Sequence, residues 1–172
     1  FSVSGSSMEP TLHNLDQIIV SKFPISIQQK FNIKIGDTPG NIKRGDIVVF
    51  HFDNSSNESS GSGTYFVKRV IGLPGESLTL KNGVITKKKK KNPSGFVLNE
   101  DYIASGVFTE GEKEIKLADD EFYVFGDNRK PNGSYDSRSW GPLKFKKIVG
   151  VVGLRILPKD NFTFFKKPDY KY

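Results

Sequence analysis

Residues 65–71 of the chain read YFVKRVI, a run of β-branched and aromatic residues that includes two basic side chains. This composition is typical of a β-strand. Successive side chains of a strand point to opposite faces, so Phe66, Lys68 and Val70 would share one face. The stretch therefore predicts a strand that places the ammonium group of Lys68 on an apolar face.

The same period of two recurs elsewhere in the sequence. Four further segments are short, rich in β-branched or aromatic residues, and bounded by Gly, Asp, Pro or Asn: residues 17–20, 47–52, 122–125 and 148–156. No segment shows the 3.6-residue period of a long amphipathic helix. The sequence thus predicts an all-β chain with closely spaced strands, in which residues 24–42 form an extended hairpin.

Three polar stretches are predicted to be loops, namely residues 53–64, 87–95 and 130–134. The first is rich in Ser and Gly. The second contains five consecutive lysines, from Lys87 to Lys91. Because no aromatic residues alternate with these lysines, a solvated hairpin tip is a better interpretation than a nucleic-acid site.

Length and charge restrict the class of protein. The chain has 172 residues, which suits one ordinary domain or a core domain with a small insertion. It carries 26 Lys and Arg against 19 Asp and Glu, and this excess suits an anionic membrane surface, a nucleic acid or a soluble basic protein. No run approaches the roughly 20 apolar residues of a membrane span. Since the chain begins with Phe1 and not with Met, we expect an N-terminal anchor or signal to have preceded it.

Several kinds of chemistry are excluded by residues that the sequence lacks. It has no cysteine, which rules out a disulfide framework, a zinc-thiolate site and a cysteine nucleophile. Two histidines, His13 and His51, are too few for most metal sites, and we expect neither a metal nor a cofactor. The motifs of α/β-hydrolases, penicillin-binding enzymes, zincins and P-loop NTPases are absent. With both histidines poorly placed for a Ser-His-Asp triad, a serine with a lysine base remains.

Lys68 is the candidate base. An ammonium group on an apolar face is poorly solvated, which favours the neutral amine and lowers its pKa from the usual value of about 10.4. A neutral amine can accept a proton near physiological pH. For an isolated strand lysine, however, a side chain that reaches out to water at the strand edge is the more common arrangement.

Four blocks occur together with this lysine, in a fixed order: SSMEPTL (6–12), RGDIVVF (44–50), YFVKRVIGLPGE (65–76) and GDNRKPNGSYDSRSWGPL (126–143). They resemble the sequence blocks of type I signal peptidases, also called leader peptidases. The resemblance covers residues 1–20, 43–76 and 122–157. It implies a signal-peptidase-like antiparallel β fold, related to that of LexA, and a membrane-associated serine endopeptidase with a Ser-Lys dyad.

The resemblance also implies a division of the chain. Residues 1–76 and 122–172 would form a catalytic β core, and residues 77–121 a small inserted β subdomain. The protein would be a monomeric bacterial membrane protein with its catalytic domain on the extracytoplasmic side. Its partners would be secretory preproteins and an anionic membrane surface, with no nucleic acid.

Roles for individual residues follow from the same resemblance. Ser7, directly before the methionine, matches the nucleophile, and Lys68 matches its general base. Ser134 matches a serine whose hydroxyl orients the lysine amine. Asp136 and Arg138 match a supporting ion pair that would hold the GDNR and DSR segments against the dyad.

One position departs from part of the family pattern. Some members have a serine two residues before the nucleophile, where its hydroxyl helps to stabilise the oxyanion, whereas this chain has Gly5, as other members do. The backbone N–H of Ser7 would then be the main donor to the oxyanion. The hydroxyl of Ser6 is a second candidate.

Substrate specificity is expected from shallow apolar pockets that bind the residues at −1 and −3 of the cleavage site. Such pockets reject bulky side chains and favour Ala-x-Ala sites. The residues at the matching positions are Phe1, Val3, Met8, Leu12, Ile18, Val49, Phe66 and Val67. Most of them would also suit a buried core in any protein. An extended substrate would bind as an added strand.

The C-terminal sequence FTFFKKPDYK, which starts at Phe162, mixes aromatic residues with lysines, as suits an anionic membrane interface. A last strand that docks its Phe residues into the core is equally compatible with it.

Two alternative functions also stay open. A LexA-like or UmuD-like self-cleaving regulator would share the Ser-Lys dyad, but the Ala-Gly or Cys-Gly bond that such proteins cut is absent. A catalytically silent assembly factor would not need both Ser7 and Lys68.

Overall fold

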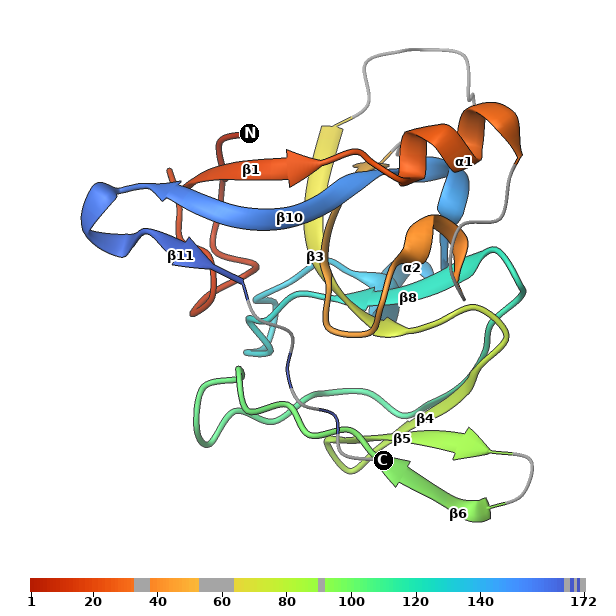
Figure 1. Ribbon diagram of the computed structural model, residues 1–172. Helices are drawn as coiled ribbons and strands as arrows, with labels where there is room; N and C mark the ends of the chain where they lie inside the picture. The colour runs from red at the N-terminus through yellow and green to blue at the C-terminus, as the bar shows by residue number, and fades with distance from the viewer. Residues whose placement is uncertain (33–37, 53–63, 90–91, 166–167, 169, 171–172) are drawn as a thin grey trace.

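The computed structural model describes residues 1–32, 38–52, 64–89, 92–165, 168 and 170. Strands dominate it, and they form two antiparallel sheets (Figure 1). The larger sheet has the strand order β1 (Gln17–Ser21), β10 (Ile148–Leu157), β2 (Ile47–Phe52), β3 (Thr64–Gly72), β8 (Glu121–Phe125) and β9 (Leu143–Lys144), and β11 (Thr163–Phe164) also pairs with β10. The second sheet has the order β6 (Asn92–Val97), β5 (Val84–Lys89), β4 (Ser77–Lys81) and β7 (Lys113–Lys116). The predicted all-β class is confirmed.

Helical elements are short. They are α1 (Ile25–Phe31), α2 (Ser137–Trp140) and three 3₁₀ turns at Pro39–Asn41, Phe145–Lys147 and Lys159–Asn161. Within the described ranges no helix is long and apolar enough to cross a membrane.

Most of β2 and the second half of β3 are buried, and their side chains pack on both faces of the sheet. Val48 and Phe50 pack on one face of β2, in the same cluster as Val70 of β3. Ile47 and Val49 pack on the opposite face, in the cluster that also contains residues of the N-terminal segment. In β3, Phe66 and Val70 belong to the first of these clusters and Val67 to the second, which confirms the alternation predicted for residues 65–71.

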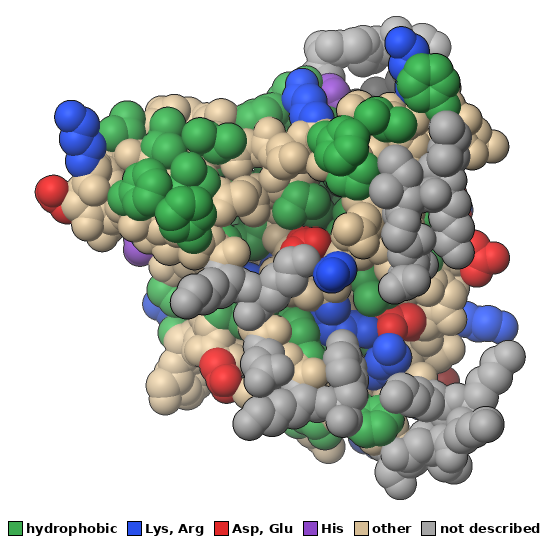
Figure 2. Space-filling model, viewed as in Figure 1, with side chains coloured by type: hydrophobic (Ala, Val, Ile, Leu, Met, Phe, Trp, Pro, Cys, Tyr) green, Lys and Arg blue, Asp and Glu red, His purple; other side chains and the backbone are tan. Residues whose placement is uncertain are grey.

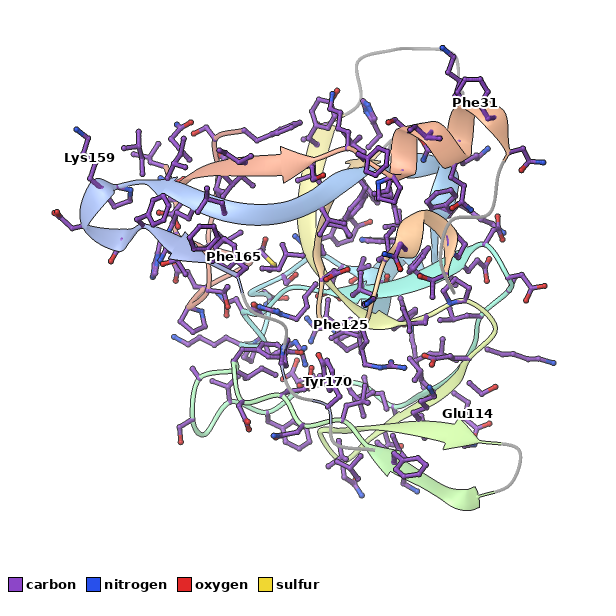
Figure 3. All side chains as sticks on the ribbon, viewed as in Figure 1. Phe31, Glu114, Phe125, Lys159, Phe165 and Tyr170 are labelled. Carbon is purple, nitrogen blue, oxygen red and sulfur yellow. The ribbon has the colours of Figure 1, made fainter. Side chains whose placement is uncertain are left out.

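The two sheets share an apolar core. Leu78 and Leu80 of β4 pack with Ile71 of β3 and Phe125 of β8 in one buried cluster. Tyr170 joins this cluster from the C-terminal segment, and Figure 3 shows it near Phe125, between the larger sheet and the second one. All four strands of the second sheet lie within residues 77–121, although the status of this segment as a separate domain remains a prediction.

The extended hairpin predicted for residues 24–42 is wrong where the chain forms α1. Of the two isoleucines in α1, Ile25 and Ile27, only Ile25 is buried. Gln29, one turn further on, donates hydrogen bonds of 3.0 Å to the carbonyl oxygens of Phe145 and Ile148. These contacts with distant residues favour a helical turn over the local β propensity.

The predicted loops have different outcomes. Residues 130–134 form a turn with no helix or strand, as predicted. The loop predicted at 87–95 is shorter than expected, because β5 continues through Lys89 and β6 begins at Asn92, while Lys90 and Lys91 lie outside the described residues. Residues 53–63 of the Ser/Gly-rich stretch also lie outside them.

Candidate active site

Ser7 and Lys68 meet beside the middle of β3. Lys68 projects from this strand toward the turn that contains Ser7, and its Nζ lies 2.8 Å from Ser7 Oγ. The same Nζ donates a 2.9 Å hydrogen bond to the carbonyl oxygen of Val67. Only 4% of Lys68 is exposed, so it does not reach out to water at the strand edge. The serine and lysine that the sequence singled out are thus in direct contact.

The environment of Lys68 favours a neutral amine. Burial lowers the pKa of Lys68 to about 8, although the negative charges of Asp136 and Asp127 act in the opposite direction. A substantial fraction of this side chain is therefore neutral at mildly alkaline pH. A neutral amine at hydrogen-bond distance from a hydroxyl can accept its proton, which is the arrangement that activates a serine nucleophile.

The turn that carries Ser7 is held by Asn128. The backbone N–H of Asn128 donates to the carbonyl oxygen of Ser7 (3.1 Å), and its side-chain amide donates to the carbonyl oxygen of Ser6 (3.1 Å). Gly5 begins the turn with a φ of 90°, a conformation that favours glycine over serine. This backbone geometry accounts for a glycine at position 5. Among the described residues, no backbone hydrogen bond uses the N–H of Ser7, which leaves this donor available to an oxyanion.

Asp136 and Arg138 form a buried ion pair. Arg138 donates from Nε and Nη2 to the two carboxylate oxygens of Asp136, at 2.9 and 2.8 Å. Asp136 also accepts from the backbone N–H of Gly126 at 3.0 Å. Burial alone would raise the pKa of Asp136, but hydrogen bonds and the charge of Arg138 hold this pKa below its usual value. The pair thus joins the DSR segment to the GDNR segment.

Ser134 lies beside these groups. A Cβ atom built on Gly126 would come within 2.2 Å of Ser134 Oγ and 2.3 Å of the carbonyl oxygen of Ser7, so the three segments approach closely and only glycine fits. Ser134 Oγ is buried and has no hydrogen-bond partner within the described part of the chain. The expected hydrogen bond to Lys68 is therefore not made in this conformation, in which the amine bonds instead to Ser7 and Val67.

A second buried ion pair, which the sequence analysis did not assign, links Arg69 to Asp127. Nε and Nη2 of Arg69 donate to the two oxygens of Asp127 at 2.8 and 2.6 Å. The hydroxyl of Thr11 also donates to Asp127. Arg69 follows the candidate base directly, and Asp127 belongs to the GDNR segment, so the pair fixes β3 relative to the loop that holds Ser7. Arg69 and Asp127 both lie in the sequence blocks quoted above, and this is the signal by which they could have been identified.

An open pocket of about 380 Å³ adjoins the two candidate catalytic side chains. Six of the eight residues predicted for substrate binding line it: Phe1, Val3, Ile18, Val49, Phe66 and Val67. Met8 and Leu12 do not line it, because they are at most 1% exposed and pack into the apolar cluster beneath the pocket. Other lining residues that the sequence did not suggest are Ser2, Ser4, Thr64, Tyr65 and Tyr135.

Backbone groups form two walls of this pocket. β3 pairs with β2 from Thr64 onward, whereas β8 pairs with it only from Arg69, so within the described residues the other edge of 64–68 is open. Across the pocket, the backbone groups of Phe1 and Val3 bond to residues 15–18. Because backbone groups of an extended chain alternate in direction, those of Ser2 and Ser4 face the pocket. An extended peptide could therefore hydrogen-bond on both sides.

The described residues contain no group of three or more His, Asp and Glu side chains suited to hold a metal ion. The site itself brings together a hydroxyl, an amine of lowered pKa, an unused backbone donor and an apolar pocket with open strand edges. These parts suit acyl transfer to a serine.

Comparison with known proteins places the chain among its relatives. A family model described as signal peptidase, peptidase S26, matches residues 1–157. The chain is 33% identical to probable signal peptidase I-2 of Synechocystis sp., over 91% of this chain and 62% of that protein, so it spans less than two thirds of that relative. It is 35% identical to signal peptidase I U of Bacillus subtilis, over 92% of this chain and 75% of that protein. A crystal structure of a signal peptidase I from Enterococcus faecalis aligns with a TM-score of 0.47 and 25% identity, over 64% of this chain and 95% of that one.

Proposed function

The chain belongs to the signal peptidase I (peptidase S26) family of serine endopeptidases, and from this premise we propose that it removes N-terminal signal peptides from exported preproteins. The observation that carries the proposal is the 2.8 Å contact between Ser7 Oγ and the buried amine of Lys68. A self-cleaving regulator would use the same pair, but the family match spans 157 of the 172 residues.

In the proposed reaction Ser7 Oγ attacks the carbonyl carbon of the −1 residue while neutral Lys68 takes the hydroxyl proton. The backbone N–H of Ser7 donates to the oxyanion that forms. The ammonium of Lys68 then protonates the leaving amine, which departs with the mature protein. Water, deprotonated by the same amine, hydrolyses the acyl-enzyme and frees Ser7.

Supporting roles are proposed for Ser134 and for the ion pair of Asp136 and Arg138. Ser134 would rotate its partnerless hydroxyl toward Lys68 when the amine leaves Val67. Asp136 would keep this segment in place through its bonds to Arg138 and to the backbone of the GDNR loop. Both roles are positional, because the proton transfers need only the serine and the lysine.

A synthetic peptide with an Ala-x-Ala site should be cut after the second alanine, because we expect the apolar pocket next to Ser7 to accept small side chains and to reject bulky ones. Replacing the −1 alanine with leucine should lower kcat/KM by about 10²-fold. Mass spectrometry of the products identifies the bond, and initial rates give kcat/KM.

Incubation of the protein alone is the control for the regulator alternative, and it should leave the chain intact. Equal cleavage of the alanine and leucine peptides would contradict the assignment of the pocket. Fragmentation of the chain itself, with the peptide untouched, would favour self-cleavage.

For its location we propose the bacterial cell membrane, with this domain on the extracytoplasmic side and apolar residues against the lipid. Figure 2 shows hydrophobic side chains gathered over β1, β10 and β11. Exposed members of this group, here called the β11 patch, are Ile19, Leu157, Phe162 and Phe164. Phe165, the next aromatic residue, packs inward instead, so the C-terminal segment combines both arrangements that its sequence allowed.

Replacing Phe162 and Phe164 with serine should weaken binding to anionic lipid vesicles by about tenfold or more, because burying a phenylalanine contributes about 1.5 to 3 kcal/mol. Both side chains are more than half exposed, at 55% and 67%, so the fold should tolerate the change. Vesicle sedimentation gives the affinity. Phe31→Ser is the control, since Phe31 is equally exposed at the other end of the molecule (Figure 3). An equal loss in that variant would contradict a specific patch.

A further inference from the structure

The loop between β6 and β7 extends from the second sheet to the GDNR segment. It carries Glu100, whose carboxylate accepts from Nη2 of Arg129 at 2.6 Å and from Nη1 at 3.1 Å. The hydroxyl of Tyr102 donates to the same carboxylate at 2.5 Å. The side chain of Arg129 is fully buried and that of Glu100 is 10% exposed. A bidentate pair with this degree of burial holds both side chains in one geometry.

Arg129 links Glu100 to the candidate active site. Its Nε donates to the carbonyl oxygen of Gly126 at 2.8 Å. The N–H of Gly126 bonds to Asp136, and its Cα packs against the carbonyl oxygen of Ser7. Asn128, the residue before Arg129, holds the same carbonyl oxygen through its own N–H. The backbone on either side of Asp127 is thus fixed between the arginine and the nucleophile turn.

Without Glu100 this arrangement loses its counter-charge. A buried guanidinium cannot discard its charge, and leaving one unpaired is strongly unfavourable. Arg129 would then be expected to turn toward water and to release the carbonyl oxygen of Gly126. Thr109, which accepts from Nη1 at 2.8 Å, is neutral and cannot replace the carboxylate.

We propose that Glu100 is a positioning residue for the Ser7–Lys68 pair, supplied by the loop that joins two strands of the second sheet and acting through Arg129 on the GDNR loop. The proposal rests on the proposed peptidase function. It gives the second sheet, whose sequence contains no catalytic motif, a direct part in the geometry of the site.

The test compares Glu100→Gln with Glu114→Gln. The first change removes the charge but keeps an oxygen acceptor for Tyr102. The second removes an exposed carboxylate of β7, the strand that follows this loop; it pairs with Lys88 at the surface and is 77% exposed. In Glu100→Gln the amide protons of Gly126 and Asn128 should exchange with solvent at least about tenfold faster, while those of β2 keep their rates. The kcat for peptide cleavage should fall by about 10- to 100-fold with little change in KM. Glu114→Gln should match the parent in all of these measurements.

Unchanged exchange at Gly126 and Asn128 in Glu100→Gln would overturn the proposal. Equal acceleration throughout β2 would do the same, since Glu100 would then support only the overall fold. Tyr102→Phe removes a single hydrogen bond and is a milder second variant, for which we expect the same two amides to accelerate by a smaller factor. If the parent cuts no peptide, the proposed function fails, but the exchange rates still decide whether Glu100 positions the loop.

Discussion

Lys68→Met should abolish peptide cleavage and at the same time raise the free energy of unfolding at neutral pH. The two effects have one cause. Burial lowers the pKa of Lys68 from 10.5 to about 8, so between these values the folded protein binds fewer protons than the unfolded chain. Stability therefore rises with pH across this window, and the unfavourable contribution of the charged amine is complete below pH 8. Methionine has a similar length and no charge, so we expect a gain of about 1 to 3 kcal/mol at pH 6, which fades toward pH 10.5.

Denaturant unfolding of parent and variant at pH 6, 8 and 10 measures this gain. Lys116→Met, on the exposed side of β7, is the matched control and should change stability by less than about 0.5 kcal/mol at each pH. The cleavage rate of the parent should climb about tenfold per pH unit below pH 8 and then level off. A Lys68 variant that is less stable than the parent at all three pH values would make Lys68 a structural ion, and the proposed base would have to be abandoned.

Ser7→Ala should lower kcat by at least about 10⁴-fold, as removal of a serine nucleophile does in other peptidases. Stability should change by less than about 1 kcal/mol, because Lys68 keeps its bond to the carbonyl oxygen of Val67. Combining the change with Lys68→Met should cost no further activity, since two groups that act in one step are not additive. Steady-state kinetics of both single variants and the double variant measure this.

Ser6→Ala is the control for this experiment. Ser6 is exposed and adjoins Ser7, but Lys68 bonds to the hydroxyl of Ser7. We expect cleavage within about tenfold of the parent, the loss allowed for a weak oxyanion donor. An inactive Ser6 variant together with an active Ser7 variant would show that the nucleophile is Ser6 and not Ser7.

The sequence predicted those parts of the molecule that depend on local pattern. Alternation along residues 65–71 was enough to place Lys68 on a buried face, and the sequence blocks brought Ser7 to the same site. Ionic contacts across long separations were not predictable in this way. Glu100 and Arg129 are 29 positions apart, and nothing in either neighbourhood indicates the other.

The errors have a similar origin. The α1 helix is favoured by hydrogen bonds from Gln29 to residues more than 100 positions away, so local β propensity gave the wrong answer. Met8 and Leu12 match family positions near the pocket, yet side-chain direction decides whether a residue near a site lines it or lies beneath it. Such directions become known only once the backbone is placed.

The open edge of β3 has a consequence for inhibitors. Peptide N–H and C=O groups are nearly the same in every amino acid. A ligand that presents them with the rise of a β-strand, about 3.4 Å per residue, can therefore bind both walls of the pocket without any particular side chain. Methylating alternate backbone nitrogens of such a peptidomimetic would remove the donors to one wall and spare the other. Selectivity would then come from the small groups that fill the apolar pocket, and affinity from a scaffold that is pre-shaped as a strand.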